Sequence, residues 1–311
     1  MVKCSGKVTI IGCGAVGSAC AYAILLKGVA KELAIIDVNE KRALGEAMDL
    51  RHGSVFFDSC VIKSGSDYSL SKDSDIVVIT AGAAQKPGQS RLELAAGNAK
   101  IMESVIPQIV KYAPNSIILM VTNPVDVMTM LALKLSGFPK NRVFGSGTTL
   151  DSSRLRFLIA QSLNMNPKSV HAYILGEHGD SEFAAWSSAT VAGIPLSKVP
   201  GYKQKSINDA FEHTKNAAYE IIALKGFTNN AIGVAVAHMC KDILTDAKRV
   251  TPLSVHLKNY EGVSNVCISV PCVLGAEGIQ EILPVTLNAH EKKQFQASAA
   301  KIKQTAKNLK I

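Results

Sequence analysis

A histidine between two glycines is the residue of this 311-residue chain whose surroundings best suit proton transfer. His178 stands in the stretch Gly-Glu-His-Gly-Asp at positions 176–180, directly after an apolar run that is typical of a strand. Histidine exchanges a proton more easily near neutral pH than any other side chain. A histidine that only caps a turn is the alternative, but three other stretches supply what a proton-transferring histidine needs. We therefore predict that His178 is a general acid and base.

An acid and an arginine near the start of a predicted helix, residues 149–163, form one of these stretches. Asp151 and Arg154 are three positions apart, so their side chains can share one face of the helix. As a surface ion pair they would contribute under about 1 kcal/mol. The alternative that we favour is functional: Asp151 orients His178, and Arg154 binds an anion through two parallel hydrogen bonds. A buried acid beside His178 would also raise the pKa of the histidine.

The first segment of the chain carries a glycine pattern that fits a phosphate-binding turn. A short apolar strand, residues 7–11, runs into Gly-x-Gly-x-x-Gly at Gly12, Gly14 and Gly17, and a predicted helix covers residues 15–26. A second strand, residues 33–36, ends at Asp37. In dinucleotide-binding turns an acidic residue follows the last glycine by roughly 20 residues, and Asp37 stands at this spacing from Gly17. The helix N-terminus would face a pyrophosphate, and Asp37 would accept hydrogen bonds from a ribose diol and repel a 2′-phosphate. The pattern favours NAD over NADP.

The alternation of strands and helices continues through the first half of the chain. Further strands are predicted at residues 61–63, 75–80, 116–121 and 143–144, and further helices at 39–50, 98–112 and 125–135. This alternation predicts an α/β fold with a doubly wound parallel sheet and with ligands at the carboxyl ends of its strands. The second half is predicted to contain helices at residues 149–163, 211–225, 227–246 and 291–308, and strands of an antiparallel sheet within 266–275.

A loop follows the strand that ends near Gly82, on the ligand side of the predicted sheet. Gly82, Pro87 and Gly88 disfavour regular structure in its first part, and the loop carries Gln85 and Arg91. We predict that residues 82–97 form a mobile lid that brings Arg91 over the site. A solvated connection without function is the alternative.

The overall composition argues against several classes of function. The formal net charge is +9, but Lys and Arg are dispersed except in the Lys-rich last segment, so we expect no nucleic-acid partner. No apolar run approaches the roughly 18 residues of a membrane span, so no membrane association is expected. The 7 cysteines form no C-x-x-C pair and no signal peptide is recognised, which predicts free thiols, a cytoplasmic location and no metal site.

The motifs, taken in order, resemble those of the L-lactate/malate dehydrogenase family. The matching stretches are residues 12–17 with Asp37, 85–91, 122–126, 150–154 and 176–180, and the similarity runs along nearly the whole chain. The resemblance implies a Rossmann-type NAD-binding domain over residues 1–145 and an α+β catalytic domain with antiparallel strands over residues 146–311. It also implies hydride transfer between NAD and a small 2-hydroxy acid, in an enzyme that is usually a homotetramer.

The resemblance assigns roles to the residues that match the family motifs. His178 is the expected proton donor and acceptor, Asp151 orients it, and Arg91 polarises the substrate ketone. The residues expected to bind substrate are Gln85, Arg91, Asn123, Arg154 and Thr228. Those expected to bind the cofactor are Gly12, Gly14, Val16, Gly17, Asp37, Gly82, Asn123 and Ile232.

Gln85 is expected to decide which 2-oxo acid is bound. Malate enzymes of the family carry an arginine at the matching position, which pairs with the second carboxylate of oxaloacetate. Gln85 would leave that carboxylate unpaired, a penalty of about 4 kcal/mol or roughly three decades of discrimination, whereas pyruvate presents only a methyl group. We therefore expect pyruvate and L-lactate as substrates, and a malate or broad-specificity 2-hydroxy-acid dehydrogenase is the alternative.

Arg156 and His171 match the basic pair at which bacterial members of the family bind fructose 1,6-bisphosphate between subunits. Members that are not activated by this sugar phosphate carry such residues too, so the resemblance leaves activation open. A phosphate site between subunits would also require an oligomer.

Overall fold

One sheet runs through the middle of the protein and forms its frame. The computed structural model describes residues 6–83 and 91–311, without the side chain at 91. Within these residues the sheet has 9 strands in the order β14-β13-β12-β6-β5-β4-β1-β2-β3. The strands from the first half of the chain run parallel to one another: β1 (Lys7–Ile11), β2 (Glu32–Ile36), β3 (Val61–Gly65), β4 (Ile76–Ile79), β5 (Ile117–Met120) and β6 (Val143–Gly145).

The order of the parallel strands reverses between β1 and β4, which pair with Ile11 opposite Ile79. This is the doubly wound arrangement that the sequence predicted, and β4 and β5 are buried along their whole length, as their apolar runs indicated. Ligands bind at such a reversal because the two loops leave the sheet in opposite directions and open a crevice between them. The reversal therefore places the glycine turn after β1 next to the loop after β4.

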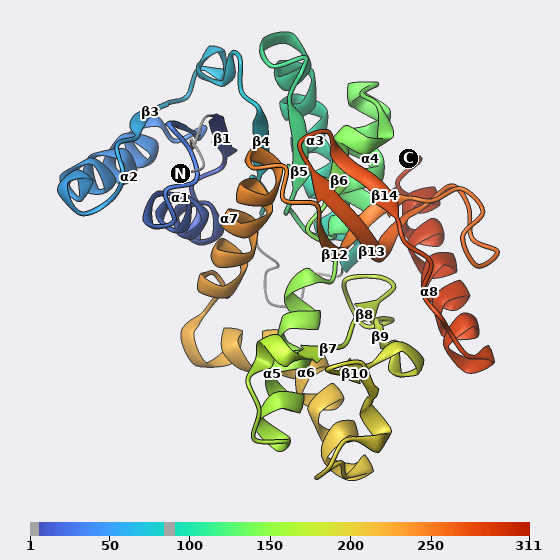
Figure 1. The fold of residues 1–311 in the computed structure, drawn as a ribbon. Helices are drawn as coiled ribbons and strands as arrows, with labels where there is room; N and C mark the ends of the chain where they lie inside the picture. The colour runs from blue at the N-terminus through green and yellow to red at the C-terminus, as the bar shows by residue number, and fades with distance from the viewer. Residues whose placement is uncertain (1–5, 84–90) are drawn as a thin grey trace.

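Strands from the second half of the chain extend the same sheet. β12 (Arg249–His256) pairs antiparallel with β6 at Ser254 and Gly145, and β13 (Cys267–Gly275) and β14 (Gly278–Ile282) follow, also antiparallel. Two small sheets lie below it in Figure 1. One contains β7 (Val170–His171), β10 (Thr190–Val191) and β11 (Ile194–Pro195), and the other β8 (Ile174–Leu175) and β9 (Phe183–Ala184).

Helices cover the sheet and form the lower part of the molecule (Figure 1). They are α1 (Ala15–Leu26), α2 (Glu40–His52), α3 (Arg91–Tyr112), α4 (Val125–Ser136), α5 (Thr149–Ser162), α6 (Gln204–Lys225), α7 (Asn230–Leu244) and α8 (Ala289–Asn308). Short 3-10 helices lie at Ser54–Phe56, Tyr68–Ser71, Lys140–Arg142, Pro167–Ser169, Trp186–Ser188 and Leu196–Lys198. Along the described part of the chain, no helix combines the length and the apolar character that a membrane crossing requires.

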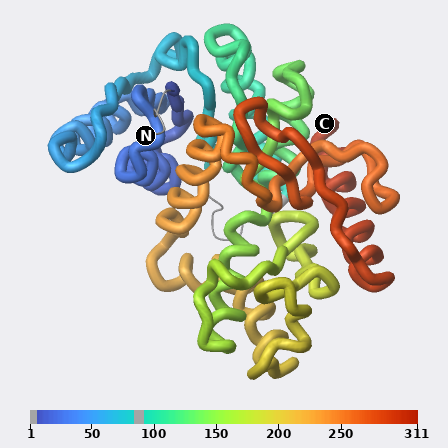
Figure 2. The backbone as a smooth tube through the Cα atoms, viewed as in Figure 1, coloured from blue at the N-terminus to red at the C-terminus, as the bar shows by residue number. Residues whose placement is uncertain are grey.

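Helix α7 packs on α1, although the two are far apart in the sequence. Figure 2 shows the orange segment of α7 running beside the blue segment of α1. The helices approach so closely that a Cβ on Gly233 would lie 2.7 Å from the backbone of Ala19. This contact joins the second half of the chain to α1, the helix that follows the glycine turn.

Several elements differ from the sequence-based predictions. The short strands β7, β9, β10 and β11 and the edge strand β14 were not predicted, and α7 begins at Asn230 rather than at residue 227. Helix α3 begins at Arg91 rather than at residue 98, so residues 91–97 of the predicted lid are helical, and α6 begins at Gln204 rather than at residue 211. Strand β12 was not predicted, because polar residues and Pro252 interrupt its apolar pattern. A proline fits here because β6 pairs with β12 only at Ser254, so no ladder hydrogen bond to β6 is lost.

Candidate active site

The backbone around His178 is held on both sides. Strand β8 ends at Leu175, and the next residue, Gly176, pairs through its N–H and C=O with Ser269 of β13 at 3.2 Å and 3.1 Å. Gly176 has φ +96°, and a Cβ there would lie 2.8 Å from Ser298 Oγ, so only glycine suits this bend. Two residues later, the backbone N–H of His178 donates a hydrogen bond to Asp126 Oδ2 at 2.8 Å.

Asp126 is a residue of the site that the sequence reasoning missed. It lies in the first turn of α4 and is 2% exposed, and its other oxygen accepts a hydrogen bond from Ser254 Oγ at 2.5 Å. Burial raises the pKa of Asp126 to about 6, although the hydrogen bonds from Ser254 and His178 act in the opposite direction. The available signal was its place in the motif at residues 122–126, from which only Asn123 was taken.

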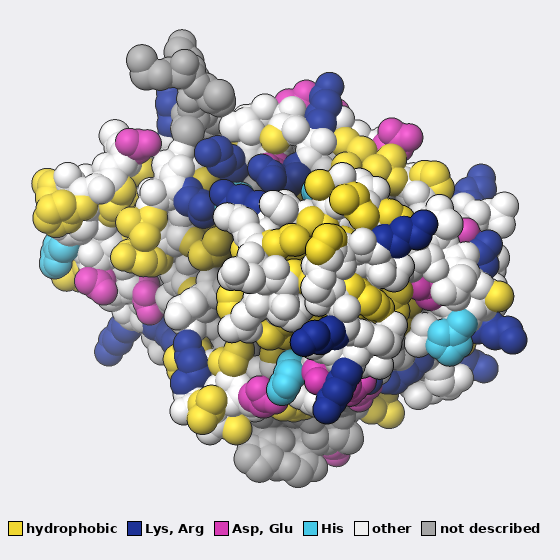
Figure 3. Space-filling model, turned by 60° about the horizontal axis from the view of Figure 1, so that its bottom comes forward, with side chains coloured by type: hydrophobic (Ala, Val, Ile, Leu, Met, Phe, Trp, Pro, Cys, Tyr) yellow, Lys and Arg dark blue, Asp and Glu magenta, His cyan; other side chains and the backbone are white. Residues whose placement is uncertain are grey.

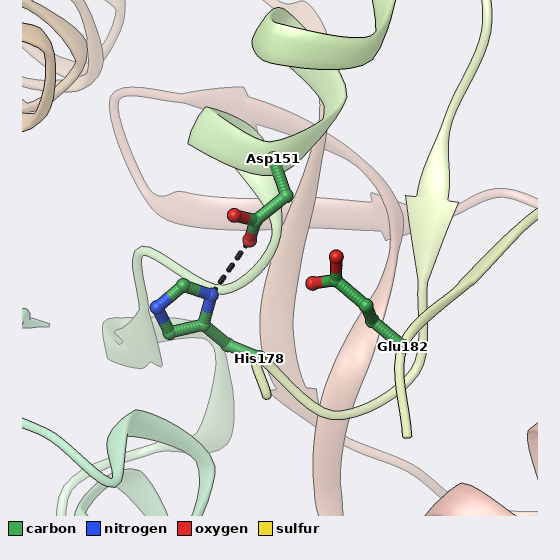
Figure 4. A group of neighbouring side chains, drawn as sticks. All are labelled: Asp151, His178 and Glu182. Atoms are coloured by element: carbon green, nitrogen blue, oxygen red, sulfur yellow. Dashed lines mark hydrogen bonds and ion pairs between the residues drawn. The ribbon is translucent and has the colours of Figure 1, made fainter. Parts of the chain in front are cut away.

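The structure brings His178, Asp151 and Arg154 into one cluster. His178 Nδ1 lies 2.6 Å from Asp151 Oδ2, and Arg154 Nη1 donates to Asp151 Oδ1 at 2.8 Å. The side chain of Asp151 is 3% exposed, whereas that of His178 is 27% exposed. Figure 4 shows Nδ1 facing Asp151 and Nε2 on the opposite side of the ring. Asp151 therefore holds the proton on Nδ1, and Nε2 is the nitrogen that can exchange a proton with a ligand.

The charges around His178 favour its protonated form. The Asp151 carboxylate raises the pKa of His178 to about 9, against the opposing effect of burial. Burial alone would raise the pKa of Asp151, but the neighbouring charges of His178 and Arg154 lower it. At neutral pH the cluster is thus an imidazolium, a carboxylate and a guanidinium. It can give a proton through His178 and bind an anion through Arg154.

The turn between β1 and α1 has the shape that a pyrophosphate group needs. Gly12 has φ +93°, and a Cβ there would lie 2.7 Å from the backbone of Ala81. A Cβ on Gly17 would lie 1.9 Å from the carbonyl oxygen of Gly12. At Gly14, by contrast, a Cβ would meet no atom within 4 Å, and no described side chain caps α1 there. The first N–H groups of α1 therefore face space that phosphate oxygens can fill.

Asp37 lies beside this turn at the end of β2. Its Oδ2 accepts a hydrogen bond from the backbone N–H of Cys13 at 2.7 Å, and its Oδ1 accepts one from Asn39 at 2.8 Å. Partial burial alone would raise the pKa of Asp37, but these hydrogen bonds lower it. An ionised acceptor in this position suits a ribose diol and repels a 2′-phosphate. The turn and Asp37 together fit NAD.

Two further predicted cofactor residues, Val16 and Ile232, lie in α1 and α7. Val16 and Ile232 are partly buried against the main hydrophobic core. The close packing of α7 on α1 brings these two positions to the same part of the molecule. Thr228 is half-buried, in the turn that precedes α7, and its place in the substrate pocket stays a prediction.

The base of the loop that starts at Gly82 is fastened by Asn98, a second residue that the sequence reasoning missed. The buried Asn98 side chain accepts a hydrogen bond from Ala83 N–H at 2.8 Å through Oδ1. Its Nδ2 donates to the carbonyl oxygen of Asn123 at 2.7 Å. Asn123 itself is exposed at the carboxyl end of β5. Gly82 and Asn123 thus lie at the ends of neighbouring strands, β4 and β5, and their roles in binding stay predictions.

Two predicted site residues are not placed. Gln85 lies outside the described residues, and so does the side chain of Arg91, although its backbone begins α3. The predicted contacts of Gln85 and Arg91 with substrate therefore stay predictions.

Arg156 and His171 lie around the 3-10 helix Pro167–Ser169 and the strand that follows it. Arg156 Nη2 donates to Pro167 O at 3.3 Å, and Arg156 Nε is buried without a hydrogen-bond partner among the described residues. His171 is exposed in β7, opposite Thr190 of β10. The exposed His171 imidazole would suit a phosphate group.

The fold and the cluster around His178 define the class of protein: an NAD-binding α/β dehydrogenase. Residues 6–145 match the family model described as lactate/malate dehydrogenase, NAD binding domain. Residues 148–310 match the model described as lactate/malate dehydrogenase, alpha/beta C-terminal domain. The chain belongs to the lactate/malate dehydrogenase family, which confirms the predicted family, fold class and cofactor.

Curated relatives and a solved structure agree with this family. An L-lactate dehydrogenase of Kosmotoga olearia is 49% identical over 304 residues, which cover 96% of this chain and 94% of the relative. An L-lactate dehydrogenase of Bifidobacterium animalis subsp. lactis is 45% identical, with 96% of both chains covered. A crystal structure of a lactate dehydrogenase from a Medee basin deep-sea metagenome library matches with a TM-score of 0.95 and 38% identity, over 99% of each chain.

Proposed function

We propose that the protein catalyses the reversible, NAD-dependent interconversion of pyruvate and L-lactate, with His178 as proton donor and acceptor. One observation carries the proposal: Asp151 lies 2.6 Å from His178 Nδ1 through one oxygen and 2.8 Å from Arg154 Nη1 through the other. A single buried carboxylate therefore fixes both the proton carrier and the anion binder. A 2-oxo acid has its ketone next to its carboxylate, so it can meet both groups at once.

Each residue has a defined task in the reduction of pyruvate. NADH, when bound, supplies the hydride, and the ketone oxygen gains negative charge. His178 gives its Nε2 proton to that oxygen while Asp151 stays ionised. Arg154 holds the substrate carboxylate through charge-assisted hydrogen bonds of about 1.5–3 kcal/mol each. Arg91 on the lid is proposed to stabilise the charge on the oxygen. In the reverse direction, neutral His178 takes the hydroxyl proton of L-lactate.

Gln85 is the proposed determinant of substrate choice, and it supports pyruvate over oxaloacetate. The comparison of kcat/KM for the two acids tests this choice, and a preference for oxaloacetate would establish the alternative malate activity. We expect Gln85→Arg to move the ratio towards oxaloacetate by two to three decades. The arginine would pair with the second carboxylate of oxaloacetate and remove the penalty of about 4 kcal/mol for leaving it unpaired. Gln89→Arg, which adds the same charge to the same loop, is the matched control and should leave the ratio nearly unchanged.

Fructose 1,6-bisphosphate is a proposed activator that would bind at Arg156 and His171. The exposed His171 imidazole supports an anion site here. Assays with and without the sugar phosphate test the proposal, and His171→Gln should weaken any activation without changing the basal rate.

We also propose that the protein is a homotetramer and that it is located in the cytoplasm. The cysteines within the described ranges are free thiols, as a reducing compartment favours.

A further inference from the structure

A third carboxyl group lies buried beside His178 and Asp151. Glu182 is 8% exposed, and its backbone N–H closes the turn after His178 by donating to Gly179 O at 3.1 Å. A carboxyl oxygen of Glu182, one of Asp151 and a ring nitrogen of His178 all lie within 4.8 Å of one another. Figure 4 shows the Glu182 side chain reaching from its own stretch of chain into the space beside the other two.

Glu182 differs from Asp151 in its partners. Both Asp151 oxygens are bonded, one to His178 and one to Arg154. Among the residues that the structure describes, none forms a hydrogen bond or ion pair with the carboxyl group of Glu182. A buried carboxylate without a partner is costly, and protonation removes the cost. The low exposure of Glu182, its lack of a bonded partner and the neighbouring Asp151 carboxylate together favour the neutral acid at this position.

The charged groups that face Glu182 come from three elements. Asp151 and Arg154 belong to α5, Lys215 to α6, and His178 to the loop after β8. Burial is the largest effect and, with repulsion from Asp151, raises the pKa of Glu182 to about 8, against the attraction of the three cationic groups. His178 in turn faces Asp126 of α4 as well as Asp151 and Glu182.

We propose that Glu182 must carry a proton before a 2-oxo acid anion can bind at Arg154, so that substrate binding and protonation of Glu182 are linked. The proposal rests on the function proposed above. An ionised Glu182 would place a second carboxylate within 4.8 Å of the Asp151 oxygen and beside the incoming substrate anion. Little water reaches this space to screen the repulsion between these negative charges, because Glu182 and Asp151 are both buried.

The link predicts how substrate affinity depends on pH. The affinity can be measured without turnover by using oxamate, the unreactive amide isostere of pyruvate, on the NADH complex. Each group that must be protonated for binding adds one to the slope of log Kd against pH above its pKa. Wild-type enzyme has two such groups, His178 and Glu182, so its slope should approach two above about pH 9. Glu182→Gln should show a slope of one.

Glu182→Gln is also predicted to be nearly normal at neutral pH, because an amide resembles the protonated acid in shape and charge. Its oxamate Kd should stay within about threefold of wild type near pH 7 and be about tenfold lower than wild type near pH 9. Glu212→Gln, which removes an exposed acid from α6, is the matched control and should follow the wild-type curve. The Kd for NADH, measured at every pH, shows that each variant is folded.

Several outcomes would overturn the proposal. One is a slope of one in the wild type, and another is loss of oxamate binding by Glu182→Gln at neutral pH. If Glu182→Gln does not fold, proton uptake by wild type on binding oxamate in weak buffer above about pH 9 decides: more than one proton per site supports the link, and one or fewer refutes it. Absence of pyruvate turnover at every pH would remove the proposed function and this inference together, whereas turnover with a slope of one would remove only the inference.

Discussion

Asp151 joins proton transfer to substrate binding, because its two oxygens bind different partners. Its contact with His178 Nδ1 sets which ring nitrogen faces the substrate, and its contact with Arg154 sets the direction of the guanidinium. Arginine has five N–H donors, so Arg154 keeps others for a substrate carboxylate. A change at Asp151 should therefore alter both the pH dependence and the substrate affinity.

Asp151→Asn should move the pH profile of pyruvate reduction to lower pH. Asp151 is the largest cause of the raised pKa of His178, about 9, so its loss returns that pKa towards or below the ordinary 6.5. Reduction needs the imidazolium, which exists only below the pKa. We expect the pH at which kcat/KM for pyruvate declines on the alkaline side to move down by more than one pH unit. A decline that stays near pH 9 would contradict the assignment.

The raised pKa of His178 also links protonation to folding stability. Protonated His178 stabilises the fold fully below about pH 6.5, and this contribution is lost as the pH rises through about 9.

Asp126→Asn should impair both stability and catalysis. The two oxygens of Asp126 accept from Ser254 Oγ and His178 N–H, and an amide can offer an oxygen to only one of these donors. An unpaired buried group costs about 1–3 kcal/mol of unfolding free energy, measured by chemical denaturation. Ser254→Ala is the matched control, because it removes only the bond that does not touch His178. Equal losses of kcat in the two variants would show that Asp126 does not position His178.

At the level of elements, two glycines of the turn after β1 have different roles: Gly17 is needed for folding and Gly14 for cofactor binding. A Cβ on Gly17 would lie 1.9 Å from Gly12 O, whereas one on Gly14 would meet no atom of the protein within 4 Å. Gly17→Ala should therefore destabilise the fold by more than about 2 kcal/mol, and Gly14→Ala should leave stability nearly unchanged but weaken NADH binding at least tenfold. Gly45→Ala in α2, where a Cβ also meets nothing, is a control for added side-chain bulk. Normal NADH affinity in Gly14→Ala would contradict the cofactor site.

Local patterns were enough to predict the elements that hold most of the site. The buried parallel strands are uninterrupted apolar runs, and the glycines and Asp37 follow strands at fixed spacing. Asp126 illustrates what such patterns lack, because it meets His178 across 52 positions, and nothing near Asp126 in the sequence indicates that contact. Strand β12 was missed for a related reason: its place between β6 and β13 is decided by long-range pairing, which its mixed polar and apolar residues do not reveal.

At the level of the whole molecule, apolar side chains on the surface support the proposed self-association. In α2 and the 3-10 helix that follows, Met48 is 53%, Val55 80% and Phe56 85% exposed. Figure 3 shows apolar patches on the face it draws, with basic side chains spread among them rather than in one stripe. A monomer seldom leaves neighbouring large apolar groups in water, because covering them is favourable.

We expect light scattering to give the mass of several chains for the purified protein. Phe56→Glu should shift that mass towards smaller species, because a charge buried in a subunit contact is costly. Circular dichroism should stay unchanged, since Phe56 makes little contact within its own chain. A monomeric wild-type protein would refute both the tetramer and the activator site between subunits.

His178, oriented by Asp151 and placed beside Arg154, is proposed to donate its proton to a 2-oxo acid. The most direct measurement is the loss of NADH absorbance with pyruvate, for wild type and for His178→Gln, with the NADH affinity of each determined in parallel. We predict turnover by the wild type and a drop in kcat of about 10²–10⁴-fold in His178→Gln, with NADH affinity unchanged. Pyruvate turnover by His178→Gln at the wild-type rate would show that His178 is not the proton donor.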